Sequence, residues 1–142
     1  MDIPKYLKHK PILCIKDYSS VDGDYKDNTD VEGMTIGKAQ WLDDEKFVPS
    51  IKIWRHTGKR WSRQSEETTL TRALDMATFI VKTIDDRVNN KKENKLSICG
   101  KKFLVDEMGN TVEFDKYIKD KKDMLLRHIE SLRKTLNGLK WS

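Results

Sequence analysis

The feature that most constrains this fold is a run of apolar residues at helical spacing between residues 70 and 88. One face of a helix there would carry Leu70, Ala73, Leu74, Ala77, Ile80, Val81, Ile84 and Val88. Such a stripe must be buried against other elements, so we expect a helix at about 66–88 that packs on a sheet. Ser65 or Thr68 would cap its start, and Glu66 and Glu67 would face the positive end of its dipole.

Strands are predicted in the segments that precede this helix. The alternating segment 34–41 (MTIGKAQW) and the segment 47–57 (FVPSIKIWRHT) have the composition of strands. Pro49 stands near the start of the second, where an edge or a bulge tolerates it. A short apolar run at 12–15 could form one more strand. Gly58 then closes a hairpin onto KRWSRQ.

A polar linker at 89–97 separates these elements from the rest of the chain. We expect a small hairpin turned at Met108-Gly109-Asn110 and a second helix at about 115–137. The lysine-rich face of that helix is either a solvated face or a surface for anions or partners. The prediction is one α+β domain, 1–142, in which a small antiparallel sheet packs against an amphipathic helix. Residues 33–88 form the core with its motif, and residues 98–140 form a hairpin and a C-terminal helix.

Composition narrows the class of protein. The 142 residues are 36% charged with a net charge of +5, which favours anionic partners without requiring them. The two cysteines, Cys14 and Cys99, have no zinc or disulfide spacing, and the carboxylates of the acidic loop 21–33 depart from calcium-loop spacing. We expect no metal and no cofactor. Neither a signal peptide nor an apolar run of membrane-spanning length is found, so we expect a cytoplasmic protein.

The stretch KIWRHTGKRWSRQSEE, residues 52–67, is called the motif below. Side chains alternate between the two faces of a strand, so the hairpin turn decides which motif residues stand together. A two-residue loop, Thr57-Gly58 or Gly58-Lys59, gives the same result in either case. One face would carry Lys52, Trp54, His56, Lys59, Trp61 and Arg63. The other would carry Ile51, Ile53, Arg55, Arg60, Ser62 and Gln64. A three-residue loop would separate the two tryptophans.

Ile51 and Ile53 are expected to pack on the helix, which would leave Trp54 and Trp61 on the opposite face beside cations. Rings that stack on a base, with Lys and Arg near phosphate, are the components of nucleotide and single-strand recognition. In the alternative, the two rings are core residues covered by the amino-terminal segment or the C-terminal helix. Arg63 or Arg72 would then form a structural ion-pair network with Glu66 or Glu67.

The predicted ligand-binding set covers most of the motif. Trp54 and Trp61 would stack on a base. The residues expected to neutralise phosphates are Lys52, Arg55, Lys59, Arg60 and Arg63. The residues expected to read hydroxyls or base edges are Gln64, Ser65, Glu66 and Glu67. His56 and Ser62 complete the set, and the Ser62 and Ser65 hydroxyls precede a helix start that suits anions.

A catalytic set could be drawn from His56, a glutamate and a serine, yet nothing in the sequence places a base near a nucleophile. No GxSxG, Walker, HExxH or dinucleotide fingerprint occurs. Whether the protein is an enzyme is therefore left open, with a non-enzymatic role favoured and no catalytic residue assigned.

The run KIWRHTGKRWSRQSEETTLTRALDMA resembles the central motif of a family of small bacterial proteins of unknown function, with the pattern KxWRHTGxxWSRQSEE followed by an amphipathic helix. The segment PKYLKHKPIL, the DGDYKDNTD loop and the GKAQW strand are also similar, so the resemblance covers about residues 3–85. It departs after Asn89. The resemblance implies that the motif forms the site, and it implies no activity.

Our leading hypothesis is non-enzymatic binding of a nucleotide-like anionic small molecule, which the protein would sense or sequester. A role in antiphage defence or counter-defence is an extension from size and site character. The alternatives are single-stranded nucleic-acid binding and a protein-interaction module that inhibits a partner. We expect a homo-oligomer, because a second copy often completes such a pocket, and no membrane partner.

Overall fold

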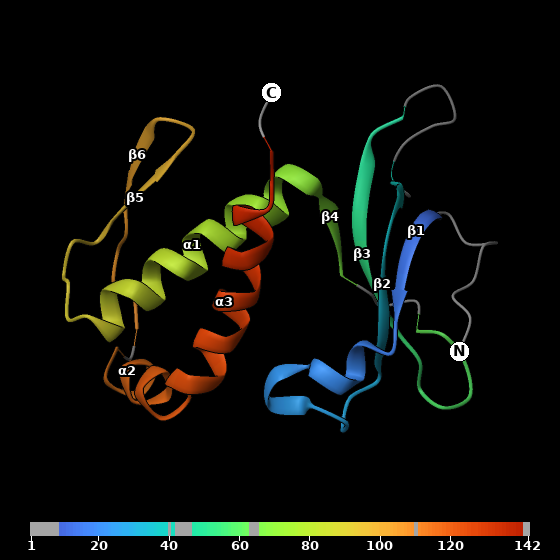
Figure 1. Ribbon diagram of the computed structural model, residues 1–142, viewed down its shortest axis with the longest axis horizontal. Coiled ribbons are helices and arrows are strands. Elements are labelled where there is room, and N and C mark those ends of the chain that lie inside the picture. Colours follow the sequence, from blue (N-terminus) through green and yellow to red (C-terminus); the bar gives the residue numbers. More distant parts are fainter. Residues whose placement is uncertain (1–8, 40, 42–46, 63–65, 110, 141–142) are drawn as a thin grey trace. The chain divides into compact units, whose positions relative to one another are not determined.

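The computed structural model describes residues 9–39, 41, 47–62, 66–109 and 111–140. The chain divides into two compact units, Met1–Leu74 and Asp75–Ser142, and each is described by itself. Both combine strands with other elements, and all strand pairs are antiparallel (Figure 1). The predicted α+β class is confirmed, with an amphipathic helix and a C-terminal helix. That all 142 residues form one domain stays a prediction.

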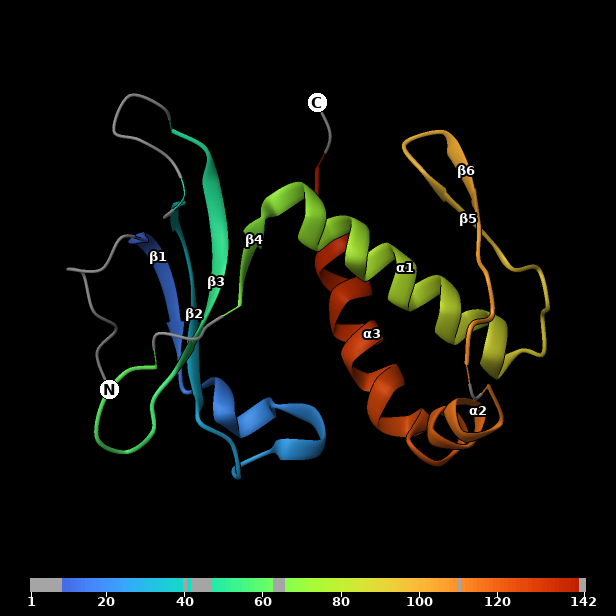
Figure 2. The same cartoon turned by 180° about the vertical axis from the view of Figure 1, so that it is seen from behind.

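The first unit contains a four-stranded sheet in chain order. Its strands are β1 (Lys10–Lys16), β2 (Val31–Lys38), β3 (Pro49–Arg55) and β4 (Glu67–Thr69). The 3-10 turns η1 (Tyr18–Val21) and η2 (Gly23–Tyr25) lie between β1 and β2, as Figure 2 shows from behind. The three predicted strands at 12–15, 34–41 and 47–57 are confirmed, with bounds shifted by a few residues.

Burial alternates along β2 and β3, which confirms the strand parity but reverses the predicted faces. The buried side chains of β3 are Ser50, Lys52 and Trp54, whereas Ile51 and Ile53 are only half-buried. A polar face can be buried when every polar group has a partner, and the partners here come from β2, β4 and His9. The prediction that Trp54 faces outward was therefore wrong.

Gly37 of β2 is a point of close approach. Its partner in β1 is Pro11, and β1 is irregular between Pro11 and Leu13. A Cβ atom at Gly37 would overlap the backbone carbonyl of Lys10. Glycine is thus required for β1 to run along this part of β2.

Helix α1 (Leu70–Val88) begins four residues later than the predicted start at 66. Residues 67–69 instead continue the sheet, with Thr68 opposite Ile51 and Thr69 opposite Ser50. β-Branched threonines suit an extended edge strand. The hydroxyl of Thr69 accepts a hydrogen bond from the Arg72 backbone amide at 3.2 Å and caps the helix, so the predicted Thr68 cap was wrong. The alternative cap, Ser65, lies outside the described residues.

The second unit holds the rest of α1, a hairpin and two further helices. Strands β5 (Lys95–Ile98) and β6 (Lys101–Leu104) meet at Cys99 and Gly100, whose φ angles are 50° and 82°. Two positive φ angles in a two-residue loop fit a tight hairpin, so the turn predicted at 108–110 was misplaced. Helices α2 (Thr111–Asp120) and α3 (Lys122–Asn137) replace the single predicted helix. No described helix is long and apolar enough to cross a membrane.

Candidate functional site

The motif forms a tight hairpin after β3. The backbone amide of Thr57 donates to the Arg60 carbonyl at 3.0 Å, and that of Ser62 donates to the Arg55 carbonyl at 2.8 Å. Gly58 and Lys59 are therefore the two loop residues, and Gly58 has the positive φ of 92° that this turn needs. The prediction of a two-residue loop is confirmed.

The same turn sets which rings meet. His56 and Trp61 form an isolated bridge, and their rings lie edge to face with centroids 5.0 Å apart. Trp61 also meets Trp54 edge to face at 5.8 Å. The predicted grouping of Trp54, His56 and Trp61 on one face is therefore correct. Edge-to-face contacts of this kind hold aromatic rings in defined orientations.

Trp54 occupies the interior end of this aromatic row and is 0% exposed. Its Nε1 donates to the Thr35 hydroxyl at 2.7 Å, and the His9 ring lies 6.1 Å away at its edge. No face of the indole is open to a ligand in this structure, which conflicts with its predicted stacking role. The alternative in which Trp54 is a core residue describes this ring better, and His9 is a described residue of the amino-terminal segment that contacts it.

A chain of hydrogen bonds runs from Trp54 through the buried face of the sheet. Thr35 Oγ1 lies 2.8 Å from His9 Nε2, His9 Nδ1 lies 3.0 Å from Ser50 Oγ, and Ser50 donates to Glu67 Oε2 at 2.8 Å. One proton arrangement satisfies every donor: indole to Thr35, Thr35 to Nε2, Nδ1–H to Ser50, and Ser50 to the carboxylate. This arrangement requires a neutral His9. Burial, the largest cause, lowers the pKa of His9 in agreement with it.

Lys52 closes the buried cluster. The residue is 5% exposed, its Nζ lies 4.3 Å from the centroid of the Trp54 ring, and it stands opposite Glu67 in the strand register. Burial lowers the pKa of Lys52, and the Glu67 carboxylate partly offsets that effect. The ammonium is thus engaged by the protein itself rather than presented to an external phosphate.

The hydroxyl, imidazole and carboxylate of Ser50, His9 and Glu67 do not form a catalytic set in this geometry. Ser50 and His9 are 0% exposed, and the Glu67 side chain is 2% exposed. Ser50 gives its proton to the carboxylate, so the imidazole cannot act as its base. Trp54, Thr35, His9, Ser50 and Glu67 instead form a buried, hydrogen-bonded polar cluster, and we call it the polar chain.

Arg55 lies on the other face of β3 and binds two carboxylates. Its guanidinium contacts Asp30 at 2.7 Å and Glu66 at 2.8 Å. The hydrogen bonds to Glu66 and then Asp30 raise the pKa of Arg55, and the bond from Arg55 lowers the pKa of Glu66. The region does contain a structural ion-pair network, and Arg55 is at its centre. The predicted Arg63 lies outside the described residues. These two ion pairs neutralise the positive charge of Arg55, which the sequence analysis had predicted to bind a phosphate.

The remainder of the predicted set is more exposed. Lys59 and Arg60 are exposed at the turn, while His56, Trp61 and Ser62 are half-buried. Within the part of the chain that the structure describes, neither Lys59 nor Arg60 forms an ion pair. We call residues 56–62 the hairpin tip. The predicted site residues Arg63, Gln64 and Ser65 lie outside the described residues.

The sequence analysis did not predict that four residues outside the motif contact this region: His9, Asp30, Thr35 and Ser50. They are 17 or more positions away from their partners in the chain. The alternation of smaller and larger side chains along 31–38 was the available sequence signal for Thr35. No sequence pattern singled out His9.

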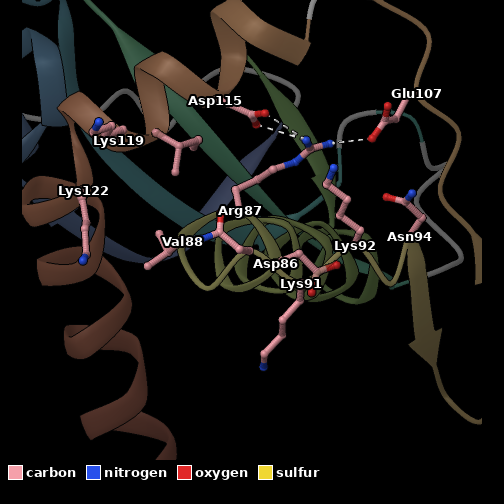
Figure 3. A pocket seen from close by; sticks show the side chains of 12 residues that line it. Asp86, Arg87, Val88, Lys91, Lys92, Asn94, Glu107, Asp115, Lys119 and Lys122 are labelled. Carbon is pink, nitrogen blue, oxygen red and sulfur yellow. Dashed lines mark hydrogen bonds and ion pairs between the residues drawn. The ribbon is translucent and has the colours of Figure 1, made fainter.

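A cavity of about 400 Å³ lies in the second unit, around Arg87 (Figure 3). Arg87 contacts Glu107 at 3.3 Å and Asp115 at 3.1 Å, and in Figure 3 the Lys92 side chain points toward the same guanidinium. The central cation is therefore already neutralised by two carboxylates. These ion pairs link the end of α1 to α2 and to the segment before α2, which indicates a structural role.

The described residues therefore define a class: a small α+β protein whose most distinctive exposed feature is an aromatic and cationic β-hairpin above a buried polar chain. The chain matches the model of a family described as "Family of unknown function (DUF6530)" over residues 1–141, and it belongs to that family. No curated protein and no solved structure matches it. The match continues well past residue 85, so the C-terminal region belongs to the family as well.

Proposed function

We propose that this protein binds a nucleotide-like anionic small molecule without transforming it, and that the hairpin tip is the contact surface. The observation that carries the proposal is the combination at residues 59–61. A half-buried indole there is oriented by two edge-to-face contacts and adjoins two exposed cations that have no ion pair among the described residues. The proposal narrows the predicted set, because Trp54 and Lys52 support the hairpin from the core.

Trp61 supplies the stacking platform in this proposal. Its contacts with Trp54 and His56 restrict the ring before a ligand arrives, which reduces the entropy lost on binding. Stacking of one base on an aromatic side chain contributes about 1–3 kcal/mol. The polar chain behind Trp54 fixes the foundation of this platform through the Trp54–Thr35 hydrogen bond.

Lys59 and Arg60 supply the charge. An ammonium and a guanidinium next to each other can contact the same phosphate group, and Arg can do so with two parallel hydrogen bonds. Arg55 and Glu66, which pair with each other, keep the stem of the hairpin in place. A cytoplasmic setting, a homo-oligomer and a defence context are extensions of the proposal.

The test is thermal stabilisation of the purified protein across mono-, cyclic and ADP-ribose-type nucleotides. A ligand at one hundred times its dissociation constant stabilises the folded state by about 2.7 kcal/mol. We expect one nucleotide class to raise Tm and the Trp61→Ala variant to lose that shift.

A short oligonucleotide at two salt concentrations serves as the comparison. Stabilisation by the oligonucleotide alone, falling steeply with salt, would replace the proposal with single-strand binding. No shift with any of these compounds would favour the protein-interaction hypothesis, in which Trp61 is an interface anchor.

A further inference from the structure

A second cavity, of about 560 Å³, lies in the first unit on the other face of β3 from Trp54. Ile53 and Arg55 alternate with Trp54 along the strand, so they project from the opposite face. Val31, Met34 and Ile53 give this cavity apolar lining, and the segment 18–30 supplies its polar and aromatic lining. The hairpin tip contributes nothing to the lining.

The loop that forms one wall is held by its own backbone. The amide of Tyr25 donates to the Asp22 carbonyl at 2.8 Å, and that of Asn28 donates to the Tyr25 carbonyl at 2.8 Å. The amide of Asp27 donates across the loop to the Ser19 carbonyl at 2.7 Å. These bonds fix the path of the loop, so the wall exists before any ligand binds.

The charges of the lining do not balance. Asp30 is paired with Arg55, whose guanidinium is also bound by Glu66. Among the residues described here, Asp22 has no ion pair. One carboxylate of the cavity therefore remains uncompensated, because Arg55, the only cation among the described lining residues, already contacts two acids. Burial, and then the charge of Asp22, raises the pKa of the neighbouring Tyr18 phenol.

Two tyrosines complete the chemistry, because Tyr18 and Tyr25 both line the cavity. The face of a tyrosine ring attracts ammonium and guanidinium groups, and a nearby carboxylate strengthens the preference for a cation. A ligand with an apolar stem could place it against Met34 and Ile53. A bare metal ion fits poorly, since no group of three His, Cys, Asp or Glu suited to a metal occurs among the described residues.

We propose that this cavity binds a small organic cation, an alkylammonium or alkylguanidinium compound, with Asp22 as its counter-charge and the two tyrosines as its aromatic walls. The site is separate from the hairpin tip and takes the opposite charge. It stands whether or not the hairpin binds a nucleotide.

The experiment is an NMR titration of the full chain, recording backbone amide shifts, with butylguanidinium and its near-isosteric neutral counterpart butylurea. We expect butylguanidinium to move amides of residues 18–34 and 53–55 in a saturable way, and butylurea to leave them nearly unchanged. Asp22→Asn should weaken butylguanidinium binding roughly threefold or more, because it removes the counter-charge.

Asp27→Asn is the matched control, because Asp27 is an exposed acid of the same loop that does not line the cavity, and asparagine tolerates its φ of 60°. It should bind butylguanidinium like the parent protein. Tyr25→Leu keeps an apolar side chain at a position that is 66% exposed, and it should also weaken binding, which covers the case in which Asp22→Asn fails to fold. Equal shifts with the neutral compound, unaltered binding by the folded variants, or no saturable shifts in these segments would overturn the proposal.

Discussion

The two halves of the motif contain the same kinds of residue and differ in what surrounds them. In the first half, Lys52 and Trp54 are no more than 5% exposed, and the polar chain engages the indole nitrogen. In the hairpin tip, Trp61 is half-buried and Lys59 and Arg60 are exposed. Both halves place a tryptophan near a lysine, yet Trp54 is buried in the core and Trp61 lies partly at the surface. The difference comes from His9, Thr35 and Ser50, whose hydrogen bonds allow polar side chains to be buried in the first half of the motif and not in the hairpin tip.

This contrast teaches that composition identifies an unusual segment without saying which of its residues face solvent. Burying Trp54 requires an acceptor for its indole nitrogen, and Thr35 provides one. Burying Lys52 requires nearby negative charge and an aromatic face, which Glu67 and Trp54 provide. Lys59 and Arg60 have no such provision among the described residues, so they stay in water.

The largest expected effect is on Trp54, the most buried ring of the comparison. Trp54→Ala should lower the free energy of unfolding by about 3–5 kcal/mol, because it leaves a large cavity and removes the hydrogen bond from the indole to the Thr35 hydroxyl. Urea denaturation measures this value. Trp61→Ala should lower the free energy of unfolding clearly less, since that ring is only half-buried. Equal losses at the two positions would remove the distinction between core ring and surface ring.

The paired glutamates of the motif sharpen the same contrast. Glu67→Gln neutralises a side chain that is 2% exposed and leaves the Lys52 ammonium without its nearby negative charge, so it should cost about 3 kcal/mol. Glu66→Gln affects a carboxylate that is 57% exposed and should cost less than about 1 kcal/mol. Chemical denaturation of both variants at pH 7 gives the comparison, and the reverse order of losses would refute the burial argument.

The polar chain also predicts a dependence on pH. Because the folded pKa of His9 lies below its unfolded value, the unfolded chain binds the extra proton first as the solution is acidified. Stability should therefore fall as pH drops from about 7 toward 5, through the unfolded pKa of His9. His9→Gln lowers overall stability but should flatten this slope, which a series of urea melts would measure. An unchanged slope would assign the pH dependence to other groups.

Arg55 should give a smaller effect than any residue of the polar chain. Its side chain is 33% exposed, so Arg55→Ala should lower the free energy of unfolding by about 1 kcal/mol or less, although two ion pairs are lost. The loss should shrink at high salt, because exposed ion pairs are screened. Unfolding curves at low and high salt measure it, and a loss that salt does not change would mean that packing dominates.

Sequence reasoning predicted the local features that depend on neighbouring residues. Strand alternation, the Gly58-Lys59 turn and the grouping of Trp54, His56 and Trp61 follow from periodicity and turn chemistry. The orientation of that face did not follow, since it depends on His9, 41 positions from its partner Ser50. Helix starts and turns were displaced where two local signals competed, as at Thr68 and Thr69.

The exposure of the candidate-site residues agrees with the sequence prediction only in part, for the same reason. The exposed cations Lys59 and Arg60 remain as the sequence suggested, whereas Arg55 is paired with two acids, one of them 25 positions away. The cavity lined by Asp22 and Tyr18 was not predicted, because the sequence of the acidic loop indicated a solvated loop rather than a calcium loop. Its aromatic walls become visible only when the loop is placed beside β2 and β3.

The measurement that tests the central claim most directly compares ligand-induced stabilisation in two double variants. Lys59→Ala with Arg60→Ala removes the cations of the hairpin tip. Lys101→Ala with Lys102→Ala removes two exposed lysines from the second hairpin, which also has a glycine turn and an aromatic residue, Phe103. With the nucleotide class that stabilises the parent protein, the first variant should lose its Tm shift while keeping its own Tm, and the second should retain the shift. A shift that survives the first change, or disappears equally with the second, would contradict binding at the hairpin tip.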